Sequence, residues 1–167
     1  MTRNKSGIDF SMLIETYMEA ENVLTAYETG KLSDLAKISK LKDKLENAID
    51  LSMAILVDIP NEMRPPMVGI LSGLYRFLGG AHMYLEEFDL AKECYENAQE
   101  MGKEIKMSAE IVQAHNNLGI IALKQSDPVE AVKQFKQAIA NLDKETTAEF
   151  GKVIRRNLAY ADSLISK

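Results

Sequence analysis

The sequence predicts an all-α fold, an array of about seven helices paired into antiparallel hairpins within a single helical domain, residues 1–167. Three observations lead to this prediction. Apolar residues recur at spacings of three and four, sustained period-two alternation and Asn-Gly or Asp-Gly turns do not occur, and one residue pattern repeats 40 residues later. A fixed period of this size is typical of stacked arrays, in which each unit buries its apolar face against its neighbours.

The repeated pattern is Leu-Gly, an Ala about a dozen residues later, an aromatic residue four positions on, and a second Ala three after that. Its first copy consists of Leu78, Gly79, Ala91, Tyr95 and Ala98. Its second copy consists of Leu118, Gly119, Ala131, Phe135 and Ala138. A partial third copy begins at Leu158 and Ala159. The pattern therefore predicts hairpin repeats at 65–106 and 108–143, followed by a C-terminal capping helix at 146–166.

The N-terminal segment, residues 6–58, is predicted to form a helical hairpin that is either a degenerate repeat or an unrelated cap. Its first helix, residues 7–28, opens on the capping pair Ser6 and Asp9 and ends before Gly30, which tolerates the left-handed conformation. The second helix begins at a Ser33 cap and runs to Asp58. The apolar face of the first helix would contain Phe10, Leu13, Ile14, Tyr17, Leu24 and Tyr27.

The third predicted helix starts at Pro65 and Pro66, which suit a first helical turn, and runs to about Glu86. It contains four glycines, whose combined cost against alanine in an exposed helix is about 3 to 4 kcal/mol. Close approach of another backbone, from a packed helix or from a ligand, would offset that cost. The four glycines are Gly69, Gly73, Gly79 and Gly80.

Four more helices follow. One begins near Asp89 and ends at about Lys106, and the next is capped by Ser108. The segment from Asp127 to Glu130 supplies an N-cap carboxylate, a proline at the first helical position and a glutamate placed to bond back to the cap. The last helix is predicted to start at Thr146 or Thr147.

Composition predicts a soluble, globular, cytoplasmic protein. The chain is 46% hydrophobic and 27% charged, and its formal charge of −5 argues against bulk binding to nucleic acid or an anionic membrane. No apolar run approaches the length of a membrane span, and the N-terminus lacks the apolar core of a secretory signal. The single cysteine cannot form an intramolecular disulfide, which fits a reducing compartment.

No motif points to catalysis, a metal or a cofactor. We therefore expect a protein that is not an enzyme and that binds neither a metal nor a cofactor. The sequence contains no HExxH, CxxC, EF-hand or GxGxxG motif. His82 and His115 fall on packing faces and are predicted to be structural. Cys94 lies in the middle of a helix, and His82 across the helix pair is its one candidate cationic neighbour, so a reactive thiolate is not expected.

The Leu-Gly, Ala, aromatic and Ala positions resemble the tetratricopeptide repeat over residues 73–167, and the interval is similar to that of the 40-residue subclass. The sequence departs from the repeat at His115, where a large aromatic residue is usual, and at Ala159, which replaces a third glycine. The resemblance implies a right-handed α-solenoid in which the first helix of each pair lines a concave groove. It also implies a non-catalytic adaptor or scaffold that binds an extended peptide or partner segment in that groove.

Carried over position by position, the resemblance implies a peptide-binding groove lined by Arg76, Phe77, Gly80, Met83, Tyr84, Asn116, Asn117, Ile120, Lys124, Arg156, Asn157 and Tyr160. A wider lining would add Gly73, Gln113, Leu123, Val153 and Leu164. The amides of Asn117 and Asn157 either bond the backbone of a bound peptide or bond between repeats, and both interpretations stay open. Arg76, Lys124 and Arg156 would favour a partner that is acidic or carries a free carboxylate.

An alternative function is self-association as a homodimer, through the N-terminal hairpin at 6–58 or through the closing helix at 146–166. The N-terminal hairpin motivates this alternative because it does not match the repeat clearly. Neither nucleic acid nor a membrane is expected as a partner.

Overall fold

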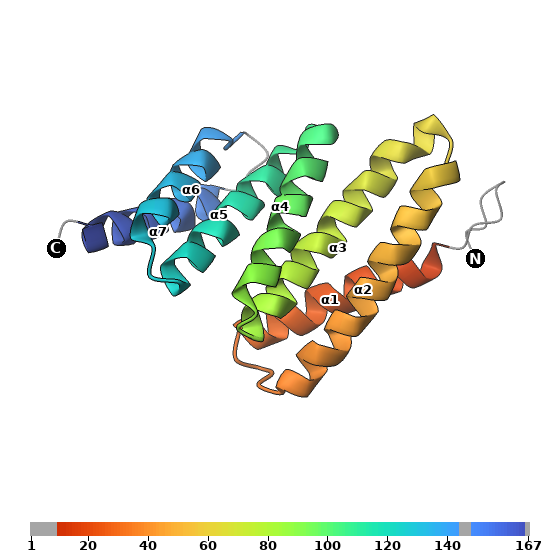
Figure 1. Cartoon of the computed structure of the whole chain (residues 1–167), viewed down its shortest axis with the longest axis horizontal. Coiled ribbons are helices and arrows are strands. Elements are labelled where there is room, and N and C mark those ends of the chain that lie inside the picture. The colour runs from red at the N-terminus through yellow and green to blue at the C-terminus, as the bar shows by residue number, and fades with distance from the viewer. Residues whose placement is uncertain (1–9, 144–147, 166–167) are drawn as a thin grey trace. The chain divides into compact units, whose positions relative to one another are not determined.

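The structure is a computed structural model that describes residues 10–143 and 148–165, and within these residues it contains helices and no strand (Figure 1). The all-α prediction is confirmed. None of the described helices is both long and apolar enough to cross a lipid bilayer. The predicted cap at Ser6 and Asp9 and the predicted helix start at Thr146 or Thr147 lie outside the described residues. The elements are α1 (Ser11–Glu28), α2 (Leu35–Asp58), η1 (Asn61–Met63), α3 (Arg64–Tyr84), α4 (Phe88–Glu104), α5 (Ser108–Lys124), α6 (Pro128–Ala140) and α7 (Ala148–Ile165).

The chain divides into two compact units, residues 1–94 and 95–167, and α4 passes from the first into the second. In the first unit, α2 packs against both α1 and α3, and α1 also contacts α3. In the second unit, α6 packs against both α5 and α7, and α5 also contacts α7. The hairpin of α1 and α2 therefore packs on α3 in the same order as α5 and α6 pack on α7. That this hairpin is either a degenerate repeat or an unrelated cap stays a prediction.

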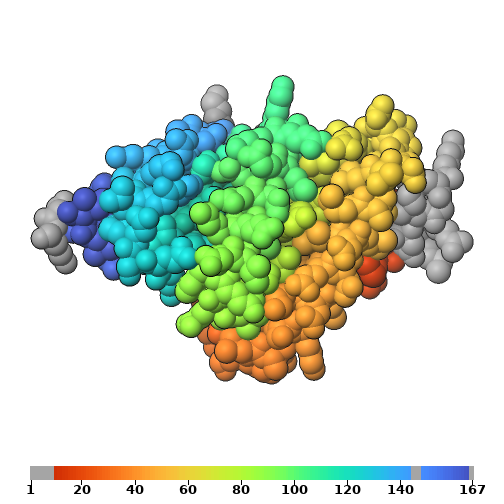
Figure 2. Space-filling model, viewed as in Figure 1, coloured from red at the N-terminus to blue at the C-terminus, as the bar shows by residue number. Residues whose placement is uncertain are grey.

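The core of the first unit takes one buried face from each of its first three α-helices. These residues are Leu13 and Leu24 of α1, Ile38, Leu41 and Leu45 of α2, and Leu71 and Leu74 of α3. In the space-filling view little of α1, in red, is visible behind the helices in front of it, among them α2, in orange, which packs against it (Figure 2).

The predicted core face of α1 is wrong at Ile14, whose side chain is 47% exposed. The buried face of this helix runs through Leu13, Thr16, Ala20 and Leu24, at helical spacings of three and four. Ile14 lies one residue beside that face and is turned out of the core.

Gly73 has a different neighbour from the one that the sequence predicted. We expected the α3 glycines to admit another backbone, but the ring of Tyr17 from α1 occupies the space that a Cβ on Gly73 would fill. Gly73 is buried there, so its missing side chain lets α1 and α3 approach closely.

In the second unit, the glycine and aromatic positions of the repeat form one contact. A Cβ built on Gly119 would lie 2.6 Å from a ring carbon of Phe135, which is fully buried. The glycine therefore allows α5 and α6 to pack closely around the ring. Around the ring, the same buried cluster includes Val112, Ala122, Ala131, Val132, Ala138, Ile154 and Ala161.

Three turns between helices share one backbone geometry and follow one another at 20-residue intervals. Their left-handed residues, with φ of 61°, 57° and 62°, are Glu86, Lys106 and Ser126. In each turn the next amide donates to a carbonyl five residues earlier, at 2.8 to 2.9 Å, as in a Schellman cap. The predicted end of the third helix at Glu86 is therefore too late, since α3 ends at Tyr84.

The predicted helix caps have mixed outcomes. The Asp127 cap is confirmed, since its Oδ1 accepts a hydrogen bond of 2.9 Å from the Glu130 amide, and Gly30 has a φ of 71° beyond α1. The Ser33 cap is wrong, because Asp34 accepts the hydrogen bond from the Ala36 amide at 2.9 Å. Ser108 is the first residue of α5 and not its cap.

Replacement of Gly119 by alanine should lower the free energy of unfolding by about 1 to 3 kcal/mol, because the new methyl group overlaps the Phe135 ring. The matched control is Gly151→Ala on α7, where, among the described residues, a Cβ would meet the flexible Arg155 guanidinium at 3.1 Å and a Leu142 methyl at 3.7 Å. That control should be neutral or stabilising by up to about 1 kcal/mol, because alanine favours the helix. Urea unfolding followed by circular dichroism measures both, and equal effects would contradict the packing role of Gly119.

A hydrogen-bonded network around Glu87 links the turn after α3 to α2 in the first unit. One carboxylate oxygen of Glu87 lies 2.6 Å from His82 Nδ1 and 3.4 Å from Lys42 Nζ. His82 is buried, so the hydrogen bond satisfies a ring nitrogen that water does not reach freely. The hydrogen bond from His82, and then that from Lys42, lowers the pKa of Glu87 below its ordinary value.

Because the folded state lowers the Glu87 pKa, the stabilisation is complete above the ordinary carboxyl pKa and is lost as the pH falls through the folded value. The variant Glu87→Gln should therefore unfold at a lower temperature than the parent at neutral pH, with a loss of about 0.5 to 1.5 kcal/mol. The difference should shrink in acid, below the ordinary pKa. Thermal melts at several pH values test this, and a constant difference would rule out the carboxylate as its cause.

Candidate functional site

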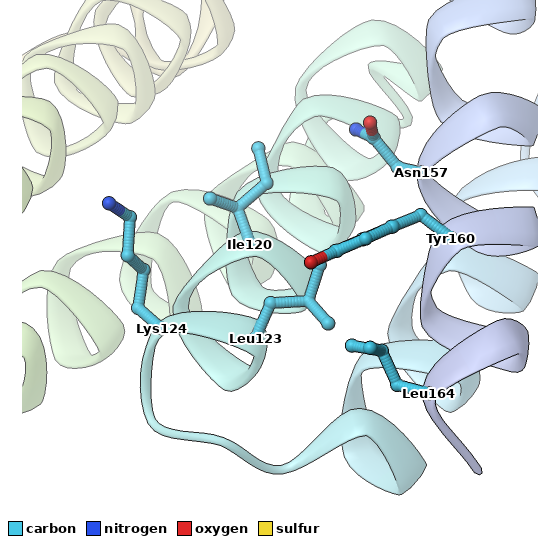
Figure 3. Close-up of a pocket in the computed structure, with 6 residues that line it drawn as sticks. All are labelled: Ile120, Leu123, Lys124, Asn157, Tyr160 and Leu164. Atoms are coloured by element: carbon cyan, nitrogen blue, oxygen red, sulfur yellow. The ribbon is translucent and has the colours of Figure 1, made fainter. Parts of the chain in front are cut away.

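The second unit contains a pocket between α5 and α7 with a volume of about 360 Å³ (Figure 3). Four of the predicted groove residues line it together: Ile120, Lys124, Asn157 and Tyr160. The other lining residues, Leu123 and Leu164, belong to the wider lining that the sequence predicted. Positions on two helices that are more than thirty residues apart in the chain are thus brought to one place.

Helical spacing explains why each of the two helices can serve the core and the pocket at once. On α5, Leu123 and Lys124 lie three and four positions after Ile120, and on α7 the pocket residues follow one another at intervals of three and four, so each set shares one face. The neighbouring faces are buried in the core, through Ile121 on α5 and through Ile154 and Ala161 on α7. The core contacts therefore hold both pocket faces in position.

The pocket combines apolar side chains with a few polar groups. Ile120 and Leu123 are half-buried, whereas Tyr160 is 58% exposed and Leu164 is 36% exposed. Figure 3 shows the Tyr160 ring extending from α7 towards α5. The polar groups of the lining are the Asn157 amide, the Tyr160 hydroxyl and the exposed Lys124 ammonium. Mostly apolar walls with a few convergent polar groups are typical of a binding site.

A short chain of asparagines links α7 to α5 beside the pocket. Asn157 Nδ2 donates to Asn116 Oδ1 at 3.2 Å, and Asn116 Nδ2 donates to Asn117 Oδ1 at 3.4 Å. Asn116 is 5% exposed, so it acts mainly within the protein. The hydrogen bond from Asn157 to Asn116 thus supports the interpretation that Asn157 bonds between repeats. An amide has two N–H donors and an acceptor, so this bond leaves Asn157 further capacity for hydrogen bonding.

In the first unit, α1 contacts three of the predicted groove residues. Arg76 donates to the Tyr17 hydroxyl at 3.4 Å. Phe77 is 5% exposed and meets the Tyr17 ring edge-on, with the ring centroids 4.8 Å apart. Tyr84 donates to Glu28 at 2.9 Å. These three side chains therefore serve the packing of α1 on α3, and Phe77 is buried by it.

The remaining predicted groove residues differ in exposure. Gly80 and Met83 on α3 and Asn117 on α5 are half-buried, and Arg156 on α7 is exposed. Arg156 does not line the pocket between α5 and α7, although it directly precedes Asn157 on the same helix.

The first unit contains a smaller pocket that the sequence did not predict. It has a volume of about 170 Å³ and is lined by Ile14, Tyr17 and Met18 of α1 and by Ile70 of α3. Ile14 and Tyr17 were predicted to face the core, and Met18 was not singled out. The spacing of four between Ile14 and Met18, one residue beside the Leu13 face, is the sequence signal that could have indicated a second apolar face.

The surroundings of Cys94 and His115 indicate structural roles for both side chains. Burial raises the pKa of the Cys94 thiol to about 12, so this sulfur is protonated at neutral pH and is a poor nucleophile. His115 bonds Gln99 at 2.8 Å and Gln134 at 2.7 Å, and burial lowers its pKa. Within 10–143 and 148–165, no group of three or more His, Cys, Asp or Glu side chains is placed to hold a metal ion.

Residues 70–144 match the family model of the tetratricopeptide repeat. The matched range contains most of α3 and all of α4, α5 and α6, and therefore both copies of the Leu-Gly pattern. No curated protein and no solved structure matches the chain significantly. Residues 70–144 are therefore similar to the tetratricopeptide repeat, a repeat that occurs in protein-interaction modules.

Proposed function

We propose that this chain is a non-catalytic interaction module that binds an extended segment of a partner protein in the pocket between α5 and α7. The observation that carries the proposal is the convergence of apolar, amide and cationic side chains from two helices on one pocket. The pocket lies near the lower end of the range for ligand sites, about 300 to 1,000 Å³, so it suits a short stretch of chain.

Each component of the pocket has a role in this proposal. Leu123 and Leu164 would receive an apolar side chain of the partner, and the exposed Tyr160 ring would close over it. The Asn157 amide has the donor and acceptor groups that match a peptide unit. Lys124 in the pocket and Arg156 beside it favour an acidic side chain or a C-terminal carboxylate.

Selection from a peptide library that includes free C-termini tests this proposal, with dissociation constants measured for the selected peptides. Tyr160→Ala should weaken binding about tenfold or more, because a central aromatic contact is lost. Lys124→Gln should weaken it about two- to fivefold and reduce its dependence on salt. The matched control is Val129→Ala on α6, which is 65% exposed outside the pocket and should bind as the parent does. Equal binding by all four proteins would contradict the proposal.

Self-association through the closing helix is a second candidate, because α7 exposes Tyr160, Leu164 and Ile165 near its C-terminal end. A homodimer formed there would cover the same pocket. Sedimentation velocity at micromolar concentration would then show a dimer that Ile165→Asp abolishes, whereas the peptide-binding module would be monomeric. A dimer that Ile165→Asp leaves intact but deletion of residues 1–58 abolishes would assign association to the N-terminal hairpin instead.

A further inference from the structure

The pocket between α1 and α3 in the first unit is a separate apolar surface. Three of its four lining residues, Ile14, Tyr17 and Met18, come from α1, which lies outside the range that matches the repeat. Ile14 is 47% exposed and Met18 is 58% exposed. Large apolar side chains that gather around a pocket at the surface indicate a site for another molecule.

One wall of this pocket is held in place by several contacts. The Tyr17 hydroxyl accepts a hydrogen bond from Arg76, and the Tyr17 ring packs edge-on against Phe77. The same ring fills the space left by the missing side chain of Gly73. Met18 beside it has a flexible thioether side chain, which can adapt to the shape of an incoming apolar group. The pocket therefore has a fixed aromatic wall and an adaptable one.

The charged groups around the pocket are mainly acidic. Glu15 and Glu21 lie three residues to either side of Met18, so they are its neighbours on the helix surface, and both are exposed. The α3 residues within three or four positions of Ile70 are uncharged: Pro66, Met67, Gly73 and Leu74. Arg76 of α3 is bonded to the Tyr17 hydroxyl. Glu19 on the same helix pairs with Lys44 of α2 at 2.7 Å.

The charge of the whole first unit has the same sign. Residues 1–94 contain ten Lys and Arg against fifteen Asp and Glu, whereas residues 95–167 contain ten of each. The formal charge of −5 therefore belongs entirely to the unit that holds this pocket. A negative field of this kind attracts cationic segments and repels anionic ones.

We propose that the pocket of Ile14, Tyr17, Met18 and Ile70 binds a protein segment in which large apolar side chains alternate with lysine or arginine. An apolar side chain enters between the Tyr17 ring and Met18, and the flanking cations lie beside Glu15 and Glu21. The occupant is thus a basic amphipathic segment, opposite in charge to the one proposed for the pocket between α5 and α7.

The test uses full-length protein with carbon-13-labelled methionine methyl groups and three synthetic peptides. The peptides share the same leucine positions and carry Lys, Gln or Glu between them. The Lys peptide should shift the Met18 methyl resonance and bind about tenfold or more tightly than the Glu peptide. Equal affinity for the Lys and Glu peptides would overturn the proposal, as would an unperturbed Met18 signal. A Met18 shift that follows protein concentration without peptide would assign the pocket to a second copy of the chain.

Variants locate the binding and separate it from folding. Met18→Glu should abolish binding of the Lys peptide, whereas Met53→Glu, at a methionine of α2 that is 47% exposed, is the matched control and should retain it. The double variant Glu15→Gln and Glu21→Gln should weaken binding about fivefold and reduce its salt dependence. Tyr160→Ala should leave binding of the Lys peptide unchanged, and a loss there would place the peptide in the other pocket. Unchanged melting temperatures show that each variant is folded.

Discussion

The contact between Gly119 and Phe135 is the constraint on which the second unit depends. A helix position without a side chain receives an aromatic ring from the next helix, so α5 and α6 come close enough to exclude water from the ring. With α6 held in this way, α7 packs on its other side and meets α5. The pocket between α5 and α7 is therefore a consequence of helix packing that is decided at the glycine.

The first unit uses the same kind of contact between different helices. Gly73 and Tyr17 bring α1 against α3, where the second unit has the asparagine bond from Asn157 to Asn116. One helix pair is thus joined by an aromatic ring and the other by amides. The two pockets beside these contacts also differ in charge. Glu15 and Glu21 border the pocket between α1 and α3, whereas Lys124 lines the pocket between α5 and α7.

Regular turns explain the 40-residue period. Left-handed residues at Glu86, Lys106 and Ser126 end successive helix segments at equal intervals, and two segments make one repeat. None of the three is glycine, although a side chain in this conformation costs about 1 kcal/mol or more. The amide of the next residue in each turn donates a hydrogen bond to a carbonyl group at the helix end, and this hydrogen bond compensates for that cost.

The sequence by itself determined the helical class, the repeat, the Asp127 cap and the shared faces of the pocket residues on α5 and α7. These features depend on local spacing and local hydrogen bonds, which a single stretch of sequence contains. The tertiary structure alone decided that Phe77 is buried against α1, that Ile14 is exposed, and that a second pocket forms beside Met18. The physical reason is that burial of a helix face depends on which distant segment packs on it. The segment that does so here, α1, belongs to the N-terminal hairpin, which does not carry the repeated pattern.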